Sequence, residues 1–177
     1  MPALPRVLDV EQLPVPELCA ARLDGDLFEL AGAWAPIDVA VTASDRAAAA
    51  ASGVPSRWVA ELGTASWIWG ARSSSPSVPQ FSAVVGERGP RPRRGVDLRE
   101  VVIRSRDVAV LGTARVTTPA RTIADLARRR EWDEAEACRL AELGHVDATT
   151  LREHAARVRR TAHGLRAAQR LEALSRR

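Results

Sequence analysis

Asp24 and Asp26 form an Asp-x-Asp pair, a type and spacing of residues that could hold magnesium ions for nucleotidyl transfer. That chemistry also needs a Gly-Ser turn shortly upstream to cradle the nucleotide phosphates. Residues 11–23 contain neither Gly nor Ser. We therefore interpret the pair as part of an Asp-Gly turn. A nuclease or nucleotidyltransferase centred on the two residues stays as an alternative to be tested.

Other catalytic patterns are missing from the sequence. His145, His154 and His163 are spaced so that successive side chains on a helix would point to opposite sides and would not share a metal ion. The sequence contains no Gly-x-Ser-x-Gly motif, no phosphate-binding P-loop and no dinucleotide fingerprint. It also has no Lys for the Glu-x-Lys arm of a restriction-type nuclease. We predict that the protein is not an enzyme and that it uses neither a metal nor a cofactor.

Arginine is the residue type that could bind a partner, because it supplies all 26 basic side chains and the net charge is +4. A GC-rich genome would also produce this abundance, so position matters more than number. Residues 1–63 are net acidic, which places any surface for a polyanion in the rest of the chain. The residues predicted to contact nucleic acid or a partner lie in the Gly- and Pro-rich loop 86–95 and on the last helix: Arg88, Arg91, Arg93, Arg94, Arg166, Arg170 and Arg177. A solvated hairpin tip and a solvated helix face are the alternatives.

Residues 116–127 mark the boundary between a strand-rich half and a helical half. Thr118 offers an N-cap oxygen and Pro119 suits the first helical position, so a helix is predicted to begin there. Arg121 and Asp125 are one helical turn apart and are predicted to form a structural ion pair. Trp58, Trp67 and Trp69 are interpreted as core residues, with stacking on nucleic-acid bases as the alternative.

The other elements follow from capping residues, turns and apolar alternation. Strands are predicted at 27–30, 80–85 and 96–104, and a hairpin at 108–116 with its turn at 111–113. Short helices are predicted at 15–21, after Ser44 and after Thr64. In the helical half, Asp133 with Glu136 and Thr150 with Glu153 each resemble a capping box, and a last helix is expected over 165–177.

Together these elements predict one α+β domain over residues 1–177. A small, mainly antiparallel sheet with short N-terminal helices would occupy residues 44–116, and a bundle of three to four helices residues 117–177. No stretch is apolar enough to span a membrane, and Cys19 and Cys138 suggest neither a disulfide nor a zinc site. We therefore expect a cytoplasmic protein. The oligomeric state stays open.

Three segments carry a resemblance to a known family. They are the Ala-rich segment that begins at Arg46, the segment Thr-Ala-Ser-Trp-Ile-Trp-Gly-Ala at 64–71, and residues 107–127. The most specific part is Thr-Thr-Pro-x-Arg-Thr-x-x-Asp-Leu-Ala at 117–127. Over about residues 20–160 the chain resembles the AbiEi-type antitoxins and transcriptional regulators of actinobacteria.

The resemblance implies a non-catalytic regulator of a type IV toxin–antitoxin pair, whose toxin is a nucleotidyltransferase encoded by a neighbouring gene. Members of the family typically bind their own promoter DNA through an N-terminal winged helix-turn-helix. Residues 1–43 are too few and too acidic for a complete module of that kind, and at most a remnant of its wing is expected at 22–33. We predict that this segment joins the main domain as a helix and a strand. A DNA-binding regulator that uses the Arg-rich loop and the basic C-terminal helices is the alternative function.

Overall fold

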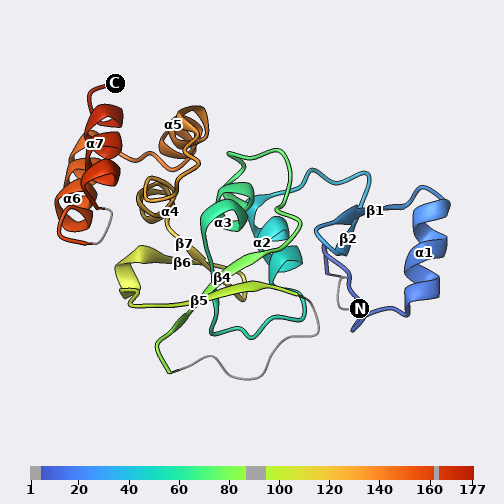
Figure 1. The fold of residues 1–177 in the computed structure, drawn as a ribbon. Coiled ribbons are helices and arrows are strands. Elements are labelled where there is room, and N and C mark those ends of the chain that lie inside the picture. Colours follow the sequence, from blue (N-terminus) through green and yellow to red (C-terminus); the bar gives the residue numbers. More distant parts are fainter. Residues whose placement is uncertain (1–4, 87–94, 162–163) are drawn as a thin grey trace.

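The computed structural model describes residues 5–86, 95–161 and 164–177 of the chain. These residues form an α+β fold that contains seven α-helices and two β-sheets, which confirms the α+β class but not a C-terminal helical bundle. Figure 1 shows the N-terminal helix and its hairpin at one end of the molecule and the last two helices at the other. The larger sheet lies between them.

The N-terminal segment forms helix α1 (Val15–Leu23) and a hairpin of strands β1 (Leu27–Leu30) and β2 (Ala33–Pro36). The strands are antiparallel and form a sheet of their own. The expectation of one helix and one strand is thus wrong in one respect. Strand β2 was missed because its sequence, Ala-Trp-Ala-Pro, has little β-propensity. A small apolar cluster of Leu8, Leu18 and Leu27 joins this hairpin to α1.

The larger sheet has the strand order β5-β4-β3-β7-β6. Its strands are β3 (Val59–Ala60), β4 (Gln80–Val84), β5 (Asp97–Val101), β6 (Val108–Leu111) and β7 (Ala114–Thr117). Strand β3 is antiparallel to β4 and parallel to β7; β4 is parallel to β5, and β6 is antiparallel to β7. The prediction of a mainly antiparallel sheet is therefore wrong: the sheet is mixed. Apolar alternation predicts which residues face the core, but it does not reveal the direction of the neighbouring strand.

The main core lies between this sheet and helices α2 (Ala43–Ala51) and α3 (Leu62–Trp69). Trp58 and Trp67 are buried in it, and Trp58 packs against Phe81. Trp69 is half-buried, and its Nε1 donates a hydrogen bond of 2.9 Å to the carbonyl oxygen of Thr117. These positions confirm that the three Trp side chains belong to the packed interior.

The helix that begins after Thr118 is confirmed. Helix α4 (Pro119–Leu126) starts with Pro119, and the side chain of Thr118 accepts a hydrogen bond from the backbone N–H of Arg121. This helix carries the segment on which the family resemblance depends.

Three other helices begin earlier than predicted. Thr42, not Ser44, caps α2 and forms a capping box with Asp45. Burial alone would raise the pKa of Asp45, but hydrogen bonds from Thr42 and Arg6 lower it. Helix α3 begins after Glu61, which places Thr64 inside the helix rather than at its cap. Asp147, not Thr150, caps α6 (Ala148–Val158). Thr42 and Asp147 are cap-type residues a few positions upstream of the predicted ones, whereas Glu61 precedes α3 without a side-chain cap bond.

Helices α4 to α7 share a second apolar cluster that includes Ile123, Leu140, Leu151 and Leu171. Helix α5 (Glu134–Leu143) ends at Gly144, as predicted. A Cβ atom at Gly144 would lie 2.3 Å from the Cβ atom of Pro119, so glycine is required where the end of α5 meets the start of α4. Helix α7 (Gly164–Leu174) packs chiefly on α6.

Candidate functional site

Arg121 on α4 lies between two buried carboxylates. Its Nε donates to Oδ2 of Asp125 at 2.8 Å, and its Nη1 donates to Oδ2 of Asp107 at 3.2 Å. Burial by itself lowers the pKa of Arg121, but the two carboxylates raise it above its usual value. The predicted pair of Arg121 and Asp125 is confirmed. Asp107 was not predicted, because it ends a short 3-10 helix, η1 (Ser105–Asp107), that only the tertiary fold brings to α4.

Asp107 also connects this ion pair to helix α6. Its Oδ1 lies 3.6 Å from Nη1 of Arg157. His154, one turn earlier on α6, is buried with 6% of its surface exposed. Burial and the charge of Arg157 lower the pKa of His154 from 6.5 to about 4, against the opposing effect of Asp107. The imidazole is therefore neutral at physiological pH.

A second buried ion pair lies where strand β3 meets helix α3. Arg99 donates from Nε and Nη2 to the two carboxylate oxygens of Glu61 at 2.6 and 2.8 Å, and Glu61 is 1% exposed. Hydrogen bonding to Glu61 raises the pKa of Arg99, against the effect of burial. The next residue, Leu62, has a φ of +51°, a strained conformation for a residue other than glycine. Glu61, Asp107 and Asp125 are thus each paired with an Arg inside the fold.

The predicted contact residues fall into two groups. Arg88, Arg91, Arg93 and Arg94 lie outside the described residues. On the last helix, Arg166 is exposed, whereas Nη1 of Arg170 donates to the carbonyl oxygens of Ala127 and Arg129 at 2.9 and 2.7 Å. Arg170 also lies over the ring of Trp132, 5.4 Å from the centroid.

Arg170 therefore binds the carbonyl oxygens that follow the end of α4. This structural role accounts for its position without any contact to a partner molecule. Burial and the nearby charge of Arg166 lower its pKa. The exposed Arg177 forms an ion pair with Glu134, in which its Nη2 lies 2.6 Å from Oε1 of Glu134. Of the three predicted residues on this part of the chain, Arg166 is the one for which the structure gives no hydrogen bond within the described ranges.

A basic groove that the sequence analysis missed runs between α6 and α7. It has a volume of about 460 Å³ and is lined by Arg152, Ala156, Arg159, Arg160 and Glu172. The three Arg residues are exposed; Arg152 lies on α6, whereas Arg159 and Arg160 lie in the turn that follows it. Arg159 is bridged to Glu172. Helical spacing does not reveal this group, because Arg159 and Arg160 lie beyond the end of α6.

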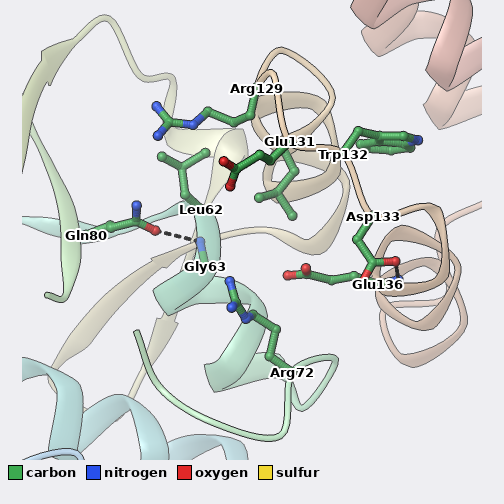
Figure 2. A pocket seen from close by; sticks show the side chains of 10 residues that line it. Leu62, Gly63, Arg72, Gln80, Arg129, Glu131, Trp132, Asp133 and Glu136 are labelled. Atoms are coloured by element: carbon green, nitrogen blue, oxygen red, sulfur yellow. Dashed lines mark hydrogen bonds between the residues drawn. The ribbon is translucent and has the colours of Figure 1, made fainter. Parts of the chain in front are cut away.

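A second cavity, of about 550 Å³, opens between the start of α3, the segment after it, and the connection from α4 to α5. Figure 2 shows Arg129 and Glu131 on one side of Leu62 and Gly63, and Arg72 on the other. The N–H of Gly63 donates to Oε1 of Gln80 at 2.9 Å. A Cβ atom at Gly63 would lie 2.7 Å from Nη1 of Arg72, so the absence of a side chain lets Arg72 approach the helix start.

The wall of this cavity formed by α5 contains Asp133 and Glu136. The side chain of Asp133 accepts a hydrogen bond of 3.1 Å from the backbone N–H of Glu136, which confirms the predicted cap. The second half of the predicted capping box is wrong, because the Glu136 side chain points into the cavity instead of returning to the backbone of Asp133 (Figure 2). Sequence reasoning assigned Glu136 a capping role and so did not single it out as a lining residue.

The Asp-x-Asp pair belongs neither to the groove nor to the cavity, which are lined by residues from Leu62 onward. Asp24 and Asp26 are exposed in the turn between α1 and β1. Across the described ranges, no group of three or more His, Cys, Asp or Glu side chains is arranged to hold a metal ion. In the same residues, no helix is long and apolar enough to cross a membrane.

Comparisons with known proteins add little to this description. No protein-family model matches the chain, and no curated protein matches it. One solved structure that is similar is that of the RV2827C protein from Mycobacterium tuberculosis, with 14% identity and a TM-score of 0.38. The match covers 96% of this chain and 76% of the other. A similarity at this level carries no argument about the fold or the function of this chain.

Proposed function

We propose that the chain is an antitoxin-like regulatory protein of a type IV toxin–antitoxin pair and that it acts without catalysis. The observation that carries the proposal is that three of the buried acids are paired with Arg side chains. Glu61, Asp107 and Asp125 are all neutralised by Arg partners inside the fold, so they stabilise the scaffold and are not available for acid–base or metal chemistry. The segment behind the family resemblance, α4, takes part in this scaffold through Arg121. The resemblance supplies the toxin–antitoxin context.

Co-expression tests this role. We expect the chain to restore growth when it is co-expressed with the nucleotidyltransferase encoded by its neighbouring gene. The double variant Asp24→Ala, Asp26→Ala should restore growth equally, because the proposed role does not use those carboxylates. Unchanged toxicity in the presence of the folded chain would contradict the antitoxin role. Loss of protection in the double variant alone would instead favour chemistry at Asp24 and Asp26.

Binding to promoter DNA is the second candidate function, and the groove between α6 and α7 favours it. Its lining contains three exposed Arg side chains and one acid, Glu172, which gives the groove a net positive charge. Arg166 on the neighbouring helix is exposed as well. A polyanion would release counterions on binding such a surface.

Changing Arg152, Arg159 and Arg160 together to Ala should weaken binding to promoter DNA. If each Arg contacts one phosphate, the slope of log affinity against log salt should become less steep by about 2 to 3. Gel-shift titrations at several salt concentrations measure this slope. Arg22→Ala, an exposed Arg on α1 at the other end of the molecule, is the control and should leave the slope unchanged. An unaltered slope in the triple variant would exclude this groove.

A further inference from the structure

Glu136 differs from the other buried acids of this protein. It is 8% exposed, and its Oε1 atom is buried without a hydrogen-bond partner among the described residues. The comparably buried Glu61, Asp107 and Asp125 are each paired with an Arg. A buried carboxylate oxygen without a donor is unfavourable, so such an atom requires an explanation.

The orientation of Glu136 indicates where its partner would come from. Figure 2 shows its carboxylate directed from α5 into the cavity, toward the space beside Gly63 and Arg72, rather than back along its own helix. Two neighbouring acceptors that line the cavity already have hydrogen-bond donors within the protein. Oε1 of Gln80 accepts from Gly63, and Asp133 accepts from the backbone of α5.

The charge of the cavity favours a positive occupant. Glu131, Asp133 and Glu136 line it together with Arg72 and Arg129, so the carboxylates exceed the guanidinium groups by one. One monovalent cation would make the lining neutral. A metal ion does not fit the donor set, because in the described part of the chain no three ligating side chains come together. The volume of about 550 Å³ is ample for a group as large as an Arg or Lys side chain.

We propose that this cavity binds an organic cation, whose ammonium or guanidinium group pairs with the carboxylate of Glu136. The same chemistry is available in a free amine and in an Arg or Lys side chain of another molecule. Gly63 keeps the floor of the site open, since a Cβ atom there would push against Arg72 and Gln80. The site is separate from the groove between α6 and α7 and does not depend on the regulatory role proposed above.

Calorimetric titration of the full chain tests the site. The probes are N-acetyl-arginine methylamide, the corresponding Lys derivative, the neutral citrulline derivative and free agmatine. We expect the Arg or Lys derivative to bind and the citrulline derivative, which has nearly the same shape without the charge, not to bind. Comparing agmatine with the amino-acid derivatives distinguishes the two sources: tighter binding of agmatine indicates a free amine, and tighter binding of the derivatives indicates a side chain of another molecule.

The variant Glu136→Gln should bind the cationic probes about ten- to a hundredfold more weakly, because a charge-assisted hydrogen bond is lost. Glu134→Gln on the same helix removes the same charge outside the cavity and should bind as the original chain does.

Three results would overturn the proposal. They are equal affinity for the Arg and citrulline derivatives, unchanged affinity in Glu136→Gln, and no binding of any cationic probe to the original chain. The first and third need no variant and hold even if Glu136→Gln fails to fold. A double-mutant cycle on stability adds a fourth: strong coupling between Glu136→Gln and Arg72→Ala without ligand would show that Glu136 pairs with Arg72 in solution.

Discussion

Replacing Arg121 with Met is expected to lower the free energy of unfolding by about 3–5 kcal/mol at pH 7, because two buried carboxylates lose their shared partner. Met retains most of the aliphatic stem, so the loss reports the charge rather than the packing. Asp125 and Asp107 have only 7% and 8% of their side chains exposed, so water cannot replace the lost guanidinium group as their partner. Since small domains unfold at a cost of about 5–15 kcal/mol, the variant should be close to unfolding. Urea denaturation followed by circular dichroism measures the change.

The control for this prediction is Arg128→Met, just beyond the same helix, where the side chain is exposed. That variant should lie within about 0.5 kcal/mol of the original chain. A loss below about 1 kcal/mol at pH 7 would show that Arg121 does not hold α4 to the rest of the fold.

The second large effect concerns pH and His154. Its pKa is about 4 in the fold and 6.5 ordinarily, so between these values the unfolded chain binds more protons than the folded chain. The stability that the neutral His154 retains is therefore fully present above about pH 6.5 and is lost as the pH falls to about 4. The total change attributable to this residue is about 3 kcal/mol. Arg157, Arg121 and Arg106 favour the neutral imidazole, and Asp107 opposes them.

The variant His154→Gln isolates this effect, because its side chain does not titrate. The difference in unfolding free energy between the original chain and the variant should change by about 3 kcal/mol between pH 7.5 and pH 4. Parallel stability curves for the original chain and His154→Gln would mean that His154 titrates normally in the fold.

Both effects depend on the same small region, where η1, α4 and α6 meet. Asp107 contributes to each, since one of its oxygens faces Arg121 and the other faces Arg157. The most specific part of the family resemblance is thus a structural element that holds the sheet to the C-terminal helices. The groove between α6 and α7 and the cavity lined by Glu136, where we propose that partners bind, lie on either side of this region.

Much of the local structure was predictable from the sequence. Thr118 with Pro119 and Gly144 marked helix ends correctly, because capping residues act on the backbone next to them. The spacing of Arg121 and Asp125 predicted their ion pair for the same reason. The hairpin of β6 and β7 followed from the turn at Gly112.

The tertiary structure decided what depends on residues far apart in the chain. The sheet is mixed because β3 pairs with both β4 and β7, a choice made by the path of the connections rather than by alternation. Arg99 reaches Glu61 and Arg121 reaches Asp107 only after folding. For Glu136 the local pattern predicted a capping partner, but packing turned its side chain into a cavity. Local backbone chemistry was therefore determined by the sequence alone, whereas the partners of the buried charges required the assembled fold, because a charge pairs with whatever the fold brings within a few ångströms.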